Sequence, residues 1–104
     1  MVELLTVSNS LEFERIIQQE LSLVAFGTPW SYPCRIQYKI LVHFIRRHSD
    51  ILAIARIDVE RHQRIARKCN IQTVPTLIIY RKSKEIKRTV GLQSAETLHD
   101  FIRT

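Results

Sequence analysis

The stretch Thr28-Pro29-Trp30-Ser31-Tyr32-Pro33-Cys34 decides how this chain is expected to fold. An apolar run over residues 21–27 precedes it, and a helical pattern begins near Arg35. A buried strand that stops at a Pro-Trp turn and leads into a helix places the turn at the carboxyl end of the strand, where the sites of α/β proteins usually form. Cys34 would then lie in the first turn of the helix, where unpaired backbone N–H groups favour an anion such as a thiolate.

Length and composition are those of one small domain. The chain has 104 residues, of which 45% are hydrophobic, so we expect a single domain over residues 1–104. Its apolar runs fall well short of the ~20 residues that cross a bilayer, and its first residues do not have the order of a secretory signal. Two cysteines suit a reducing compartment. We therefore expect a cytoplasmic protein with no membrane contact.

The formal net charge of +6 calls for an explanation. Five basic residues lie within Arg81–Arg88, which we interpret as a hairpin and mostly as a solvated turn. No recognition helix or RNA-binding motif accompanies them, so nucleic acid is not an expected partner, whereas an acidic protein partner stays open. No two histidines have i, i+4 spacing, and with only two thiols we expect no metal site and no cofactor.

Apolar periodicity and turn residues predict nine elements. Strands are expected over 1–7, 21–27, 51–58, 77–80 and 85–90, and helices over 11–19, 31–48, 60–69 and after Ser94. Ser8-Asn9-Ser10 and Ser94 would supply the N-cap side chains of the first and last helices, and Asn70 a left-handed C-cap after the helix 60–69. The run 21–27 shows no alternation, which is typical of a central strand covered on both faces. The predicted order is β-α-β-α-β-α-β-β-α.

This order and several motifs resemble the thioredoxin family over essentially the whole chain. The active-site loop of that family normally reads Trp-Cys-Gly-Pro-Cys, and Trp30, Pro33 and Cys34 match it. The segment Ile71–Thr76 looks like the cis-proline segment of the family, and Val90-Gly91 precedes the last helix as it does there. The resemblance implies an α/β thioredoxin fold, with a central mixed β-sheet flanked by helices on both faces.

Several positions depart from the family pattern. Ser31 stands where the attacking cysteine is expected, and a hydroxyl cannot form an S–S bond, so the dithiol cycle is closed to this loop. We expect the Ser31 side chain to cap the helix, with a hydrogen bond to the Cys34 sulfur as the alternative. Other departures are Ala25 for a buried aspartate, Gly27 for an aromatic residue and Lys39 for a proline.

Each cysteine has a functional and a structural interpretation. In the family, the position of Cys34 belongs to the second, resolving cysteine. Cys34 is therefore either a single thiol that forms mixed disulfides, or a buried thiol of low reactivity. Cys69 lies on the apolar stripe of the predicted helix 60–69, so we expect it in the core and not bonded to Cys34.

The resemblance also implies a groove for clients around Cys34, with Pro75 facing the loop. A client would bind there as an extended segment by β-type pairing. The expected lining residues are Trp30, Tyr32, Pro33, Thr73, Val74, Pro75, Gly91 and Leu92.

The leading hypothesis is a thioredoxin-like protein of cell redox homeostasis, limited to mixed-disulfide exchange at Cys34 or to client binding. Its partners would be protein clients, with glutathione or a reductase of the thioredoxin-reductase type. Two alternatives stay open: a dithiol reductase in which Ser31 replaces a natural cysteine by engineering, and a non-enzymatic adaptor with a basic docking surface. The additional departures at Ala25, Gly27 and Tyr32 favour natural divergence.

Overall fold

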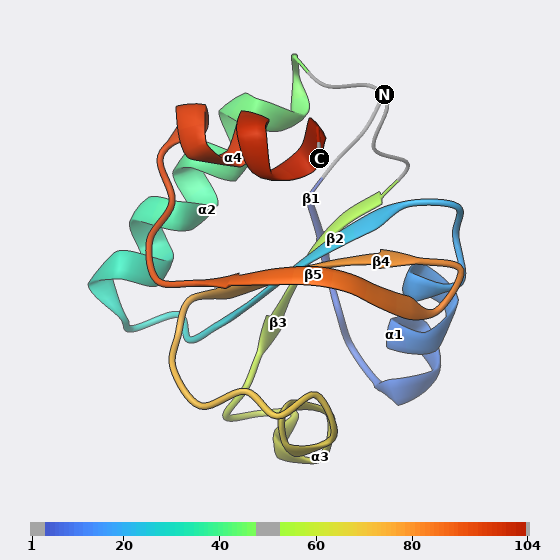
Figure 1. The fold of residues 1–104 in the computed structure, drawn as a ribbon. Helices are drawn as coiled ribbons and strands as arrows, with labels where there is room; N and C mark the ends of the chain where they lie inside the picture. Colours follow the sequence, from blue (N-terminus) through green and yellow to red (C-terminus); the bar gives the residue numbers. More distant parts are fainter. Residues whose placement is uncertain (1–3, 48–52, 104) are drawn as a thin grey trace.

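The computed structural model describes residues 4–47 and 53–103, and its elements follow the predicted order (Figure 1). The strands are β1 (Leu4–Thr6), β2 (Ser22–Gly27), β3 (Ala53–Asp58), β4 (Thr76–Arg81) and β5 (Lys84–Val90). The helices are α1 (Ser10–Ile17), α2 (Tyr32–Ile45), α3 (Gln63–Lys68) and α4 (Ala95–Arg103). The predicted elements over 1–7, 31–48 and 51–58 extend partly outside the described residues. None of the described helices has the length and hydropathy of a membrane span.

The five described strands form one mixed sheet in the order β1-β3-β2-β4-β5. β1, β3 and β2 are parallel, whereas β4 runs antiparallel to β2 and β5 antiparallel to β4. Thr76, the first residue of β4, pairs with Phe26 on one side and with Val90 on the other. The end of β2, the start of β4 and the end of β5 therefore meet at one edge, and the site lies there.

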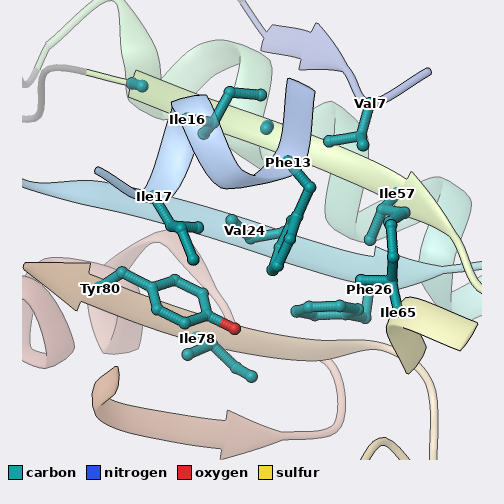
Figure 2. Close-up of a cluster of buried hydrophobic side chains, with 12 residues drawn as sticks. Val7, Phe13, Ile16, Ile17, Val24, Phe26, Ile57, Ile65, Ile78 and Tyr80 are labelled. Atoms are coloured by element: carbon teal, nitrogen blue, oxygen red, sulfur yellow. The ribbon is translucent and has the colours of Figure 1, made fainter. Parts of the chain in front are cut away.

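Strand β2 is the centre of the sheet because both of its faces are covered. All six of its residues are buried, as the unbroken apolar run predicts. Val24 and Phe26 point toward the side of α1 and α3, where Phe13 packs edge-on against Phe26 (Figure 2). Leu23 and Ala25 point toward the opposite side, which α2 and α4 cover (Figure 1). The core is thus two apolar layers separated by the sheet.

Short-range signals position three helix ends as expected. The Asn9 side chain caps α1 by accepting a hydrogen bond from the backbone N–H of Glu12 at 2.8 Å. Ser94 Oγ accepts from the Thr97 N–H at 3.2 Å in front of α4. Asn70 has φ 58° just after α3, the left-handed conformation predicted for it.

Two expectations about the second half of the chain are corrected. The helix predicted over 60–69 is shorter, because α3 begins only at Gln63, and Cys69 is half-buried at its C-cap rather than in the core. The basic cluster is not mainly a turn. Only Lys82 and Ser83 form the turn, with positive φ, and the remaining residues belong to β4 and β5.

Helix α2 carries a buried polar residue that the apolar pattern did not predict. Gln37 is fully buried, and its amide bonds the backbone of Gln93 twice. Nε2 donates to the Gln93 carbonyl at 3.1 Å, and Oε1 accepts from the Gln93 N–H at 2.7 Å. This pair of bonds ties the middle of α2 to the segment that follows Gly91, and so holds two parts of the site edge together.

Replacing Gln37 by alanine should lower the free energy of unfolding by about 1–3 kcal/mol, because both backbone groups of Gln93 lose their partner in a partly buried place. Urea unfolding followed by circular dichroism measures this change. Gln72→Ala is the matched control, since Gln72 is exposed and has no side-chain partner among the described residues. A loss no larger than that of the control would contradict the structural role of Gln37.

Candidate functional site

Three segments that are far apart in the sequence meet at the edge of the sheet described above. The loop after β2 and the first turn of α2 carry Trp30 to Cys34, the segment before β4 carries Pro75, and Gly91 follows β5 directly. The Gly91 N–H donates to the Pro75 carbonyl at 2.8 Å, and the Val74–Pro75 peptide bond is cis. The structure therefore brings the predicted loop, proline segment and glycine together.

Large apolar side chains lie exposed at this edge. Trp30 and Tyr32 are 67% and 68% exposed, Leu92 is 44% exposed and Val90 is 56% exposed. Of the other predicted lining residues, Thr73, Pro33, Val74 and Gly91 are exposed or half-buried, and only Pro75 is buried. Val90 was not predicted as a lining residue, because the alternating pattern of residues 85–90 indicated only that it belongs to an edge strand. Exposed aromatic and aliphatic groups gathered in one place are typical of a surface that binds another chain.

The indole of Trp30 is held in place despite its exposure. Its Nε1 donates to Glu60 Oε1 at 2.9 Å, and the backbone N–H of Glu60 donates to Asp58 Oδ1 at 3.0 Å. Glu60 follows β3, the strand beside β2, which is why it can reach the loop. The sequence analysis gave Glu60 no role. Its position just after the strand that neighbours β2 was the signal that could have suggested a contact with the active-site loop.

Ser31 is the N-cap residue of α2, but only its backbone, and not its side chain, bonds to the helix. It occupies the N-cap position with φ −74° and ψ 125°, but its hydroxyl makes no capping hydrogen bond, so that prediction was wrong. Its carbonyl accepts the first helical bond, from Arg35 N–H at 3.0 Å. Pro33 fits the first turn because this position has no intrahelical partner for an N–H group. The side chain at position 31 is largely buried, with 9% exposed.

Cys34 is fully buried, and its sulfur lies over Gly27. A Cβ atom added to Gly27 would come within 2.8 Å of Cys34 Sγ and within 2.6 Å of the Tyr38 hydroxyl oxygen. Both distances are shorter than real contacts, so only glycine leaves room for these two groups at the end of β2. The glycine at a position where the family has an aromatic residue is thus explained by the tyrosine on α2, which fills the same space.

Tyr38 is the polar group that shares this space with the sulfur. Burial raises its pKa to about 12, and the nearby Cys34 adds to the increase. The Arg56 guanidinium lies 5.2 Å from the centre of the Tyr38 ring, and its positive charge opposes this increase in the pKa. The hydroxyl is therefore protonated at neutral pH, so it can donate a hydrogen bond but cannot act as a base. Ala25 pairs with Arg56 across β2 and β3, and it supplies no carboxylate that could act as a base in place of Tyr38.

Cys69 does not belong to the site. Its sulfur lies 3.5 Å from the Tyr80 hydroxyl and packs against the cluster on the α1 and α3 face, whereas Cys34 is on α2. Burial raises the pKa of the Cys69 thiol. Both cysteines are free thiols, in agreement with the expectation that they do not bond to each other.

Gly27→Ala should cost about 1–3 kcal/mol of the free energy of unfolding, because the added methyl group has to displace the Tyr38 hydroxyl and the Cys34 sulfur. Adding Tyr38→Phe to this variant removes the shorter of the two clashes and should restore part of the loss. Chemical unfolding of the parent, both single variants and the double variant gives the coupling between the two positions. Strictly additive losses would show that the two residues do not compete for this space.

Comparison with known proteins agrees with this geometry. The sequence profile of the thioredoxin family matches residues 4–104. The chain is 30% identical over 87 residues to a thioredoxin of Alicyclobacillus acidocaldarius, covering 83% of each chain, and 29% identical over 80 residues to one of Bacillus subtilis, covering 77% of each. The solved structure of a mutant thioredoxin from Halobacterium salinarum is similar with a TM-score of 0.89 and 27% identity, over 97% of this chain and 88% of that one. The protein therefore belongs to the thioredoxin family.

Proposed function

We propose that this redox protein of the thioredoxin family binds extended protein segments at the edge that carries Trp30, Pro75 and Leu92, and that its thiol chemistry is limited to mixed-disulfide exchange at Cys34. One observation carries the proposal. Apolar side chains are presented to solvent around Pro75, while a serine occupies the attacking position and the Cys34 sulfur is fully buried. Binding is thus favoured over turnover.

Backbone groups beside Pro75 support binding of an extended chain. Among the described residues, the N–H and C=O of Val74 have no hydrogen-bond partner, and Val74 is only half-buried. The Thr73 carbonyl, in contrast, accepts from Thr76 Oγ1 at 2.6 Å. An extended client that pairs with Val74 would satisfy both free groups, and its side chains would contact the exposed apolar residues on either side.

The chemistry of a single sulfur sets what the protein does with a bound disulfide. The Cys34 thiolate attacks one sulfur of the client disulfide, an S–S bond forms to Cys34, and the other client sulfur leaves as a thiolate. Ser31 cannot then break the new bond, so an external thiol such as glutathione has to release the client. Because Cys34 is fully buried, the loop also has to open before the attack.

The structure bears on the two alternatives in different ways. The fit of Tyr38 over Gly27 extends the divergence from the family beyond position 31, which supports a natural serine there. The adaptor alternative differs from the proposal only in the reactivity of Cys34. Thioredoxins work with protein clients and with thioredoxin reductase or glutathione systems, and we propose the same partners here, in the cytoplasm.

The unaltered protein should reduce insulin disulfides with almost no turnover in the presence of dithiothreitol, and Ser31→Cys should raise the rate, because it restores an attacking thiol one helical turn from Cys34. Turbidity of the released insulin B chain measures the rate. Ser83→Cys is the matched control, since it adds a thiol in the β4–β5 turn, away from the site. Rapid turnover by the unaltered protein would rule out the single-thiol limitation.

Reactivity of Cys34 separates the proposal from the adaptor alternative. With Cys69→Ala as background, Cys34 should react with glutathione disulfide slowly in the folded protein and give one mixed disulfide, which mass spectrometry detects. A folded protein that forms no such adduct, while the unfolded chain does, would favour the adaptor.

Client binding should depend on the exposed apolar residues at the edge. A tryptophan-free, alkylated insulin B chain should change the fluorescence of Trp30, which is the only tryptophan of the chain. Leu92→Ala should weaken this binding about tenfold, because the isobutyl group is lost from the contact area. Leu11→Ala, which truncates a leucine 62% exposed on α1, should leave the affinity unchanged. Equal effects of the two variants would argue against this edge as the binding surface.

A further inference from the structure

A cavity lies apart from the edge that carries Trp30, Pro75 and Leu92, which we call the client edge. Its volume is about 680 Å³, which is within the range of small-molecule sites. It opens between the β1–β3 side of the sheet and α2, and Cys34, Pro75 and Leu92 are not among its lining residues. The walls come from β1, the loop after β2, α2, and β3 with the loop that follows it.

One wall of this cavity is apolar and aromatic. Leu4, Val7 and Val42 contribute aliphatic side chains, and Tyr38 contributes an aromatic ring. Val42 is 40% exposed although it lies on α2 among residues that pack on the sheet. A cavity wall of this kind favours a ligand with a flat apolar part, because burying that part removes apolar surface from water.

Cationic groups surround the same cavity. Four basic side chains line it against a single carboxylate, that of Asp58, which already accepts the Glu60 N–H. The cations are Arg35, Lys39, Arg56 and Arg61. The salt bridges found among the described residues lie elsewhere, in the pairs Lys68–Glu14, Lys82–Glu20, Arg88–Glu85 and His99–Asp100. No described carboxylate therefore forms a salt bridge with any of these four cations, although Asp58 lines the same cavity.

One of these cations is preorganised. The Arg56 Nε donates to Thr6 Oγ1 at 3.1 Å, and its guanidinium lies over the Tyr38 ring. Both contacts leave the two terminal nitrogens without a partner among the described residues. A guanidinium held in this way loses little side-chain entropy when it binds an anion, and its planar donors match a phosphate oxygen pair.

We propose that this cavity binds a small aromatic phosphate, with the ring against Tyr38 and Val42 and the phosphate among Lys39, Arg56 and Arg61. The proposal combines the two properties that occur together here: an apolar wall large enough for a ring system, and four cations that form no salt bridge with a described carboxylate. The cavity is distinct from the client edge, so the proposal of a ligand here does not depend on the thiol chemistry of Cys34.

Calorimetric titration of the full chain with 1-naphthyl phosphate and with inorganic phosphate tests both properties. The naphthyl ester should bind with one site per chain and at least about tenfold more tightly than inorganic phosphate, since only the ester uses the apolar wall. Lys39→Gln/Arg61→Gln should weaken the ester about tenfold or more, because two charged contacts are lost. The charge-matched control, Arg64→Gln/Arg67→Gln, removes two exposed cations of α3 that do not line the cavity and should change the affinity less than about twofold.

A further variant places the ligand in the cavity even if the double variant folds poorly. Val42→Glu adds a carboxylate to the apolar wall and should abolish binding of the naphthyl ester while circular dichroism shows an unchanged fold. The proposal is overturned if the ester does not bind, if inorganic phosphate binds equally well, if folded Val42→Glu keeps its affinity, or if the control pair weakens binding as much as Lys39→Gln/Arg61→Gln does.

Discussion

The close approach of α2 to the end of β2 is the contact on which the site depends. Gly27 has no side chain, so Cys34 Sγ and the Tyr38 hydroxyl both lie against its backbone, closer than a methyl group at that position would allow. With the first turns of α2 seated this deeply, the sulfur is fully buried, whereas Trp30 in the preceding loop and Tyr32 at the start of α2 remain exposed. The missing side chain of Gly27 thus leaves the room in which these two groups of α2 approach the end of β2.

The chemistry follows from that arrangement. A dithiol oxidoreductase needs an exposed attacking thiol and a second thiol to release the product. Here a serine stands at the first position, and the group next to the second is a tyrosine whose pKa is raised to about 12, so it cannot take up a proton at neutral pH. What remains exposed is the apolar edge around Pro75, with the indole of Trp30 held by Glu60. A surface that is ordered and apolar before a client arrives loses little entropy on binding.

Charge is distributed separately from this apolar edge. Arg35, Lys39, Arg56 and Arg61 come from α2, β3 and the following loop, and they line a cavity on the β1 side of α2. Arg88, in contrast, is paired with Glu85 through two hydrogen bonds of 2.6 and 2.7 Å. The charges of Arg88 and Glu85 therefore offset each other within β5, whereas the four cations of the cavity form no salt bridge with a described carboxylate and share the cavity only with Asp58.

The sequence by itself determined the element order, the central position of strand 22–27, the caps at Asn9 and Ser94 and the left-handed Asn70, because each depends on neighbours a few residues away. The resemblance of its motifs to the thioredoxin family also predicted which loop, proline and glycine form the site edge. Only the tertiary structure decided that Ser31 does not use its hydroxyl as a cap, that Tyr38 occupies the space above Gly27, and that Glu60 holds Trp30. These contacts join segments that the chain brings together only when the sheet and α2 pack, and no local pattern encodes how closely two such segments approach.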